Sequence, residues 1–232
     1  MDEIRAAHDR VLERIAKACA RVGRDPAGVQ LVAVSKTVPA LRLRDAIEAG
    51  ITTFGENRVQ EADGKVAAVP GATWHLVGPL QSNKARRALE IFDAIQTVHS
   101  VALAERLDAQ LATAGRRDYP VLLQVNVDRD PAKAGLAPEA VESAIEAVTR
   151  TDRLRLRGLM TVGRLVDEPE AARATFVALR RLAEDLRGRW PGLGDDLSMG
   201  MTDDFEVAIE EGATIVRIGR AIFGERPRAA DR

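Results

Sequence analysis

The sequence has little of three things that often define a protein class. It has a single cysteine, Cys19, among 232 residues, which excludes an internal disulfide and suits a reducing cytosol. Aromatic residues make up only 3% of the chain, so we expect a core built from aliphatic side chains. Its 34 Lys and Arg residues nearly balance its 35 Asp and Glu residues, so bulk charge does not indicate a nucleic-acid or anionic membrane partner.

The sequence also lacks a basic and apolar leader, and no apolar run approaches the roughly 18 residues that a membrane-spanning helix needs. We therefore expect a soluble, cytoplasmic protein. No solenoid repeat and no linker rich in Gly, Ser or Pro divides the chain, which predicts one domain over residues 1–232. Within it, we expect residues 1–24 to form a helix packed on the rest and residues 226–232 to form a tail.

What the chain does have is a regular alternation of short apolar segments with helical patterns. The strand candidates are residues 31–34, 51–54, 73–77, 94–98, 121–127, 154–160, 196–199 and 213–219. Eight strand and helix units in this length predict an α/β fold, a single (β/α)8 or TIM barrel with an extra N-terminal helix. A doubly wound open sheet is the alternative, and it is disfavoured because no G-x-G-x-x-G motif opens the first strand–helix turn.

Lys36 stands at the end of the first predicted strand, whose residues 31–34 are nearly all apolar. A lysine at the mouth of a buried strand loses hydration, and this loss favours its neutral amine. A neutral amine is the nucleophile that forms a Schiff base with an aldehyde or ketone. The alternative for a lone lysine is a side chain that reaches solvent from the strand end.

The segments that follow the last two strands, LSMGMTDD and VRIGRAIFG, have features of an anion site. In TIM barrels these loops commonly hold phosphate. Ser198 offers a hydroxyl donor, and Gly200 and Gly219 permit a close approach of the backbone. Ordinary turns would explain each glycine alone. Together with Lys36, the segments predict a site for a phosphorylated aldehyde, for which pyridoxal 5′-phosphate (PLP) is the obvious candidate.

Arg217 lies in the VRIG segment, where we expect its guanidinium near the cofactor ring. Because arginine stays protonated, it would disfavour protonation of a neighbouring pyridine nitrogen. An unprotonated ring withdraws electrons weakly, which suits binding or mild racemase-like chemistry better than decarboxylation or transamination. An ion pair between Arg217 and a nearby aspartate is the alternative. The predicted strand ends hold no cluster of His and carboxylates with metal spacing, so no metal site is predicted.

Motifs spread over nearly the whole chain resemble those of the YggS/PROSC family of pyridoxal-phosphate-binding homeostasis proteins. They are AVSKT at 33–37, FGENRVQE at 54–61, WHLVGPLQSNK at 74–84, LLQVNV at 122–127, RGLMT at 157–161, LSMGMTDDFEVAIEEGAT at 197–214 and VRIGRAIFG at 216–224. This resemblance implies the barrel that is related to the N-terminal domain of alanine racemase.

The resemblance also implies roles for single residues. Lys36 is the implied aldimine lysine, and Arg217 is placed at the pyridine nitrogen. Ser198 and the backbone of Gly219 and Arg220 are the implied phosphate ligands. Many relatives carry Thr or Ser at the position of Arg220, whose guanidinium could reach the phosphate or point to solvent.

Four further residues are implied to line the pocket. They are Asn57, His75, Met160 and Met199. For His75 the alternative is a buried histidine that is hydrogen-bonded inside the barrel, away from the cofactor.

The implied function is reversible binding of PLP in intracellular vitamin B6 homeostasis, with delivery to PLP-dependent apo-enzymes and no efficient catalysis. Alanine racemase uses a second base, a tyrosine from a partner's second domain. Here the one tyrosine, Tyr119, begins the fifth strand, at the wrong end of the barrel. A low-activity PLP-dependent amino-acid racemase is the alternative, and a cofactor-free Schiff-base aldolase is a third hypothesis. Without a second domain we expect a monomer.

Overall fold

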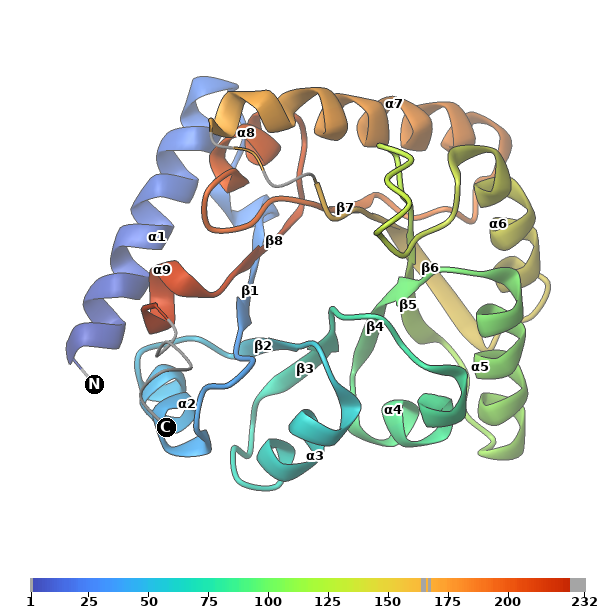
Figure 1. Cartoon of the computed structure of the whole chain (residues 1–232), viewed down its shortest axis with the longest axis horizontal. Coiled ribbons are helices and arrows are strands. Elements are labelled where there is room, and N and C mark those ends of the chain that lie inside the picture. Colours follow the sequence, from blue (N-terminus) through green and yellow to red (C-terminus); the bar gives the residue numbers. More distant parts are fainter. Residues whose placement is uncertain (1, 164–165, 167, 226–232) are drawn as a thin grey trace.

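The computed structural model describes residues 2–163, 166 and 168–225, and its strands form a closed parallel barrel (Figure 1). The strands follow one another around the barrel in chain order, and β8 closes it by pairing with β1. Their bounds are β1 (Gln30–Val34), β2 (Thr53–Glu56), β3 (Thr73–Leu76), β4 (Ala94–Val98), β5 (Tyr119–Gln124), β6 (Leu154–Met160), β7 (Asp196–Ser198) and β8 (Ile215–Ile218). The predicted TIM barrel is confirmed, and the predicted tail at 226–232 lies outside the described residues.

Helices surround the barrel and connect successive strands. The α-helices of the described chain are α1 (Asp2–Arg21), α2 (Ala40–Glu48), α3 (Val59–Val66), α4 (Ala85–Ile91), α5 (Val101–Thr113), α6 (Val141–Thr149), α7 (Arg173–Arg189), α8 (Phe205–Glu210) and α9 (Arg220–Phe223). Short 3₁₀ helices occur at η1 (Pro26–Gly28), η2 (Ser82–Lys84), η3 (Pro138–Ala140) and η4 (Pro169–Ala172). The N-terminal helix expected from the sequence is present as α1.

Apolar side chains form two separate clusters, one on each side of the barrel wall. The larger cluster joins the outward-facing strand residues to the helices, and includes Ala33, Leu43 and Phe176. The smaller one contains strand residues such as Val32 and Leu122, and two residues just beyond a strand, Val77 and Val162. It therefore fills the barrel interior. Because strand side chains alternate in direction, this division assigns every second residue of a strand to the interior.

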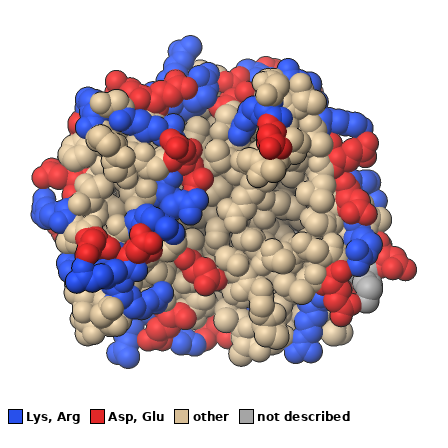
Figure 2. Space-filling model, turned by 180° about the vertical axis from the view of Figure 1, so that it is seen from behind, with Lys and Arg blue, Asp and Glu red and all other residues tan. Residues whose placement is uncertain are grey.

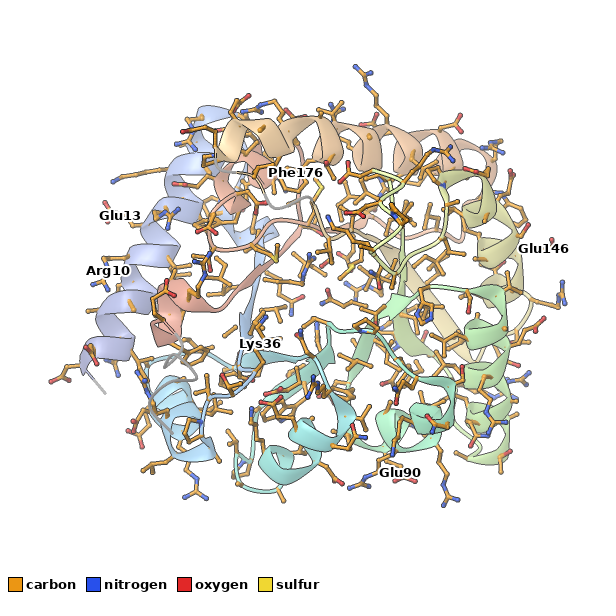
Figure 3. The ribbon with its side chains drawn as sticks, in the orientation of Figure 1. Arg10, Glu13, Lys36, Glu90, Glu146 and Phe176 are labelled. Atoms are coloured by element: carbon orange, nitrogen blue, oxygen red, sulfur yellow. The ribbon has the colours of Figure 1, made fainter. Side chains whose placement is uncertain are left out.

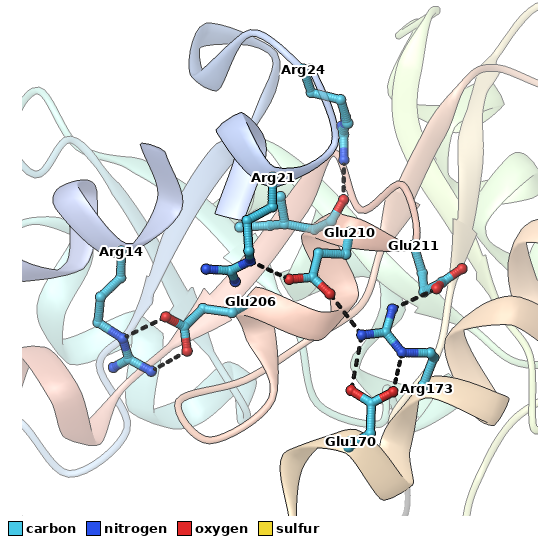
Figure 4. Close-up of polar contacts among 9 residues, drawn as sticks. Arg14, Arg21, Arg24, Glu170, Arg173, Glu206, Glu210 and Glu211 are labelled. Atoms are coloured by element: carbon cyan, nitrogen blue, oxygen red, sulfur yellow. Dashed lines mark hydrogen bonds and ion pairs between the residues drawn. The ribbon is translucent and has the colours of Figure 1, made fainter. Parts of the chain in front are cut away.

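Helix α1 lies against α8, and arginines fasten the two together (Figure 4). Arg14 pairs with Glu206 at 2.9 Å, and Arg21 pairs with Glu210 at 2.5 Å. Glu210 also accepts from Arg173, at the start of α7. These contacts join the first helix to elements near the end of the chain, next to strand β8.

Charges of both signs are interleaved on the molecular surface. Seen from behind the view of Figure 1, basic and acidic side chains cover one side and the rim, and a broad hollowed area between them carries neither (Figure 2). This pattern agrees with the balanced composition of the chain. No helix of the described residues is long and apolar enough to cross a membrane.

Candidate functional site

A cavity of about 330 Å³ opens at the carboxyl end of β1. Lys36 lines it directly after this strand, together with Gly219 and Arg220 from the end of β8 and Arg42 from α2. Figure 3 shows Lys36 just beyond the end of β1, and the parallel register of Val34 with Gly55 sets it beside the end of β2. The structure therefore brings together the predicted nucleophile and the predicted glycine of the anion site. The volume falls within the range of small-molecule sites.

The pairing of β1 with β8 explains this neighbourhood. Ala33 is in register with Ile218, so the residues that follow each of them leave the barrel side by side. A Cβ built on Gly219 would lie 3.2 Å from Val34 O, which shows how closely the two backbones approach. Helix α9 begins at the next residue, Arg220. The amides of Ile222 and Phe223 donate to Gly219 O, so those of Arg220 and Ala221 are the ones without an acceptor within the helix.

The loop between β7 and α8 lies beside the same end of β8. Gly200 O accepts from Arg217 N–H at 3.0 Å, which extends the pairing of these strands beyond Ser198. Gly200 has φ of 91°, and a Cβ there would come within 2.6 Å of Ala208 Cβ, so glycine is required. From this loop the Asp203 carboxylate accepts from the Arg220 guanidinium. The side chain of Arg220 thus pairs with a carboxylate, a partner that the sequence did not indicate.

A chain of hydrogen bonds crosses the barrel interior from β8 to β3. Arg217 Nη1 donates to Ser198 Oγ at 2.7 Å, and Ser198 Oγ donates to Gln96 Oε1 at 2.6 Å. Gln96 Nε2 in turn lies 2.8 Å from His75 Nδ1. The other terminal nitrogen of Arg217, Nη2, donates to Thr161 O at 2.7 Å. We call Arg217, Ser198, Gln96 and His75 the inner chain.

The direction of the inner chain follows from its first member. Arginine can only donate hydrogen bonds, so the Ser198 hydroxyl accepts from it and donates its own hydrogen bond to the amide oxygen of Gln96. The amide nitrogen of Gln96 then donates to His75 Nδ1, which places the imidazole proton on Nε2. Burial lowers the pKa of His75 to about 4, and nearby Arg157 adds to this effect while Asp93 opposes it. His75 is therefore neutral at physiological pH.

Arg217 is the one member of the inner chain that carries a charge. Its side chain is only 4% exposed, and burial lowers its pKa to about 10 while Asp204 opposes the shift. It is still protonated at neutral pH. The sequence analysis offered an ion pair with a nearby aspartate as the alternative. Asp204 acts on Arg217 only as a nearby charge, since the hydrogen bonds of the guanidinium go to Ser198 and Thr161.

Ser198 and Met160 both lie inside the barrel wall. Met160 belongs to the interior apolar cluster and is in register with Ser198 on the neighbouring strand. The Ser198 hydroxyl is fully buried, and both its hydrogen bonds are made within the inner chain. Its implied contact with phosphate stays a prediction, and the structure shows a different use for the hydroxyl.

Two expected pocket residues are placed elsewhere. Met199 directly follows Ser198, and successive side chains point to opposite sides of the barrel wall. Met199 is therefore fully buried in the outer apolar cluster beneath the helices. Asn57 lines a separate hollow of about 510 Å³, with Pro79 and Lys84. The expectation that Met199 lines the pocket is therefore corrected, because strand alternation directs its side chain away from the interior.

A second polar cluster lies on the outer side of β1 and β2, directly behind Lys36. Glu56 is completely buried and accepts from Lys65 Nζ at 2.7 Å and from Ser35 Oγ at 2.6 Å. Lys65 Nζ also donates to Ser35 O at 2.8 Å and to Glu61 at 3.1 Å. We call Ser35, Glu56, Glu61 and Lys65 the outer cluster. The sequence analysis missed it, although the spacing of Glu61 and Lys65 is typical of an ion pair on one helix.

In the outer cluster the pKa values of the two carboxylates shift in opposite directions. Burial raises the pKa of Glu56 above its ordinary value, although hydrogen bonds from Lys65 and Ser35 oppose the shift. Burial also raises the pKa of Glu61, but hydrogen bonds from Thr37 and Lys65 outweigh it, and the net pKa lies below the ordinary value. Among the described residues, no group of three His, Cys, Asp or Glu side chains is placed to hold a metal ion.

Comparisons with known proteins agree on one family. The profile of the family described as alanine racemase, N-terminal domain, matches residues 8–227. The pyridoxal phosphate homeostasis protein of Pseudomonas aeruginosa is 47% identical over 230 residues, which cover 95% of this chain and 97% of that protein. The protein of the same name from Escherichia coli K12 is 41% identical over 235 residues, which cover 97% of this chain and 98% of that protein.

Solved structures give the same result. The structure of PipY from Synechococcus elongatus with PLP bound superposes with a TM-score of 0.80 at 41% identity, covering 90% of this chain and 100% of that one. An alanine racemase of Clostridium difficile superposes with a TM-score of 0.75 at 14% identity, covering 99% of this chain and 58% of that one. At that identity the likeness to the racemase shows the fold alone.

Proposed function

We propose that this chain, which belongs to the family of pyridoxal phosphate homeostasis proteins and has the alanine racemase N-terminal fold, binds PLP covalently at Lys36. Its role would be to buffer the reactive cofactor inside the cell and to deliver it to apo-enzymes, without efficient catalysis of its own. The observation that carries the proposal is the cavity at the barrel rim that is lined by Lys36, Gly219 and Arg220.

The residues of this cavity fit the two reactive parts of the ligand. When bound, PLP supplies an aldehyde carbon that forms a C=N bond to a primary amine, while the aldehyde oxygen leaves as water with two protons from that amine. Lys36 is the primary amine in the wall. Arg42 adds positive charge, and Arg220, whose guanidinium also pairs with Asp203, adds a backbone N–H at the start of α9. A dianionic phosphate is matched by this set of donors.

The barrel interior next to the cavity suits the ring of the ligand. Met160 and Val32 make the interior apolar there, and the buried guanidinium of Arg217 provides a fixed positive charge, although all three lie behind the residues that line the cavity. We assign Arg217 to the ring nitrogen. Because its pKa of about 10 keeps it charged at neutral pH, it disfavours a proton on that nitrogen. A ring without this proton is a weak electron sink, which favours storage over turnover.

The one tyrosine of the chain is not available as a second base. Tyr119 lies at the start of β5, is 2% exposed, and donates its hydroxyl to Phe92 O at 2.7 Å. Burial raises its pKa, so the phenol keeps its proton. Racemisation needs a proton donor and an acceptor on opposite faces of the bound substrate. Lys36 alone supplies one of these groups, which supports the non-catalytic role.

The test is the absorbance spectrum of the purified protein with PLP, recorded before and after borohydride reduction. We expect an absorbance band that reduction bleaches, and a phosphopyridoxyl group mapped by mass spectrometry to Lys36. Lys36→Ala should abolish the trapped adduct and keep part of the reversible binding. An adduct on another lysine such as Lys84, or no adduct in the unaltered chain, would overturn the proposal.

The catalytic alternative has its own test. The loaded protein is incubated with single L-amino acids in deuterated water, and exchange of the α-proton is followed by NMR. We expect no exchange above that of free PLP. Exchange at a rate that depends on Lys36 and far exceeds the rate with free PLP would favour the racemase.

A further inference from the structure

The turn that carries Lys36 has a backbone conformation that its sequence does not favour. Val38 N–H donates to Ser35 O at 3.0 Å, so Lys36 and Thr37 are the two central residues of a β-turn. Thr37 has φ of 67°, a value that type II turns require at this position and that Gly or Asn usually supplies. For a β-branched residue this conformation is a true outlier, because Cβ crowds the backbone. Contacts outside the turn must therefore hold it.

Helix α3 supplies these contacts on both sides of Lys36. The carbonyl of the preceding residue, Ser35, accepts from Lys65 Nζ at 2.8 Å. The amide of the following residue, Thr37, donates to Glu61 Oε1. Glu61 and Lys65 also pair with each other at 3.1 Å, one helical turn apart. A single ion pair thus binds the backbone immediately before and immediately after the reactive lysine.

Lys65 is the more buried member of this ion pair, since the Glu61 side chain is 26% exposed. The side chain of Lys65 is 11% exposed, and its second carboxylate partner, Glu56, is 0% exposed. Glu56 also accepts from Ser35 Oγ, so the same cluster holds the side chain as well as the carbonyl of that residue. A charged group in this surrounding has few alternative partners, and its geometry is well defined. A strained backbone persists only where its surroundings over-determine it in this way.

We propose that Glu61 and Lys65 are positioning residues, which hold the Ser35–Val38 turn so that the amine of Lys36 faces the cavity shared with Gly219. This inference rests on the proposed function, in which Lys36 captures the aldehyde. Neither residue touches the ligand, and both act through the turn. Without the contacts from Glu61 and Lys65, Thr37 relaxes to a negative φ, and the side chain of Lys36 no longer keeps its direction.

The experiment compares covalent capture with reversible binding in a Glu61→Ala variant. Capture is measured as the rate at which PLP is fixed to Lys36, by borohydride quenching and mass spectrometry. Reversible binding is measured with pyridoxine 5′-phosphate, which has an alcohol in place of the aldehyde. We expect capture to slow by about tenfold, the effect of one lost hydrogen bond to a charged group, and the affinity for the alcohol analogue to stay within about twofold.

Two further variants separate positioning from a general loss of structure. Asp63→Ala removes a different carboxylate of α3, whose partner is Arg87 on the surface, and should change neither measurement. Thr37→Gly in the Glu61→Ala background should restore the rate, because glycine adopts a positive φ without support. If Glu61→Ala does not fold, Glu61→Met is measured in its place, since it keeps much of the volume and removes the acceptor of Thr37 N–H.

The outcomes distinguish this inference from the proposed function. If the unaltered chain captures no PLP at Lys36, the proposed function fails. If the unaltered chain and Asp63→Ala capture PLP while Glu61→Ala does so at the same rate, the positioning role is overturned and the function stands. Failure of Thr37→Gly to restore the rate also overturns it, because Glu61 would then act by some route other than the turn.

Discussion

The inner chain and the outer cluster lie on opposite sides of the same barrel wall, and they carry charge differently. The inner chain has one charge, on Arg217, and neutral groups lead from it to His75. In the outer cluster, Lys65 lies within hydrogen-bonding distance of two carboxylates, those of Glu56 and Glu61. One arrangement holds a buried cation inside the barrel, and the other bonds to the backbone of the Ser35–Val38 turn on both sides of Lys36. The difference shows that buried polarity serves two purposes in one barrel.

The strongest way to break this comparison is to remove the cation of the outer cluster. Lys65→Met leaves the fully buried Glu56 carboxylate without its ion pair. We expect a loss of about 3–5 kcal/mol in the free energy of unfolding, measured by urea denaturation at pH 7. The double variant Lys65→Met/Glu56→Gln should recover at least half of this loss. A loss below about 1 kcal/mol in the single variant would show that the pair is not essential to the wall.

The inner chain should make the free energy of unfolding depend on pH through His75. The pKa of His75 is lowered from 6.5 to about 4 in the folded protein, so the unfolded state binds the extra proton between these values. Stability therefore falls as pH decreases from about 6.5 to 4, by up to about 3 kcal/mol. In His75→Asn, whose oxygen replaces Nδ1 as the acceptor, this contribution should vanish. Unfolding curves across pH 4–7 for both proteins make the measurement, and parallel curves would contradict the prediction.

Ser198 sharpens the comparison by separating a structural hydroxyl from a ligand hydroxyl. Ser198→Ala removes the acceptor of Arg217 Nη1 and the donor to Gln96 Oε1 inside the barrel. We expect a loss of about 2 kcal/mol in stability and little change in the affinity for inorganic phosphate, measured by competition with PLP. A tenfold loss of phosphate affinity at unchanged stability would instead make Ser198 a direct ligand.

The smallest effect is expected at the exposed ion pair between α1 and α8. Arg14 and Glu206 are 39% and 32% exposed in their side chains, so solvent screens their attraction (Figure 4). Arg14→Ala should cost about 0.5–1 kcal/mol in urea denaturation, part of which reflects its stacking on Phe205. The loss should shrink in high salt. A loss as large as that of Lys65→Met would remove the distinction between buried and exposed charge.

The sequence was sufficient for the barrel, because apolar strand segments and helical patterns alternate clearly along it. Element ends were harder to predict. The second strand was expected at 51–54 and is found at Thr53–Glu56, because Ile51 N–H closes the end of α2 on Ala46 O and its side chain packs there. The fifth strand ends at Gln124 because Asn126 bonds to Asp130 in the loop that follows.

The sequence predicted those parts of the site that depend only on which strand end a residue follows. Lys36 and Gly219 follow neighbouring strands, and their sequence positions were enough to bring them together. Gln96 was missed because its partner Ser198 lies far away in the sequence. The spacing of Glu61 and Lys65 indicates an ion pair, but their contacts with Thr37 and Ser35 on another segment could not be read from it. Met199 was expected to line the pocket, but it lies in the outer layer, because a shift of one residue along a strand moves a side chain from the interior to the outside.

The closure of β8 on β1, and the seating of α1 on α8, have a consequence for synthesis on the ribosome. Helix α1 has partners such as Glu206 and Glu210, which are translated about 190 residues after their arginines. Its apolar face, with Val11 and Ile15, stays without these partners until α8 is made. Contacts between the two ends of a chain also slow folding. We expect nascent chains stalled before α8 to bind chaperones through α1, and completed chains to release them.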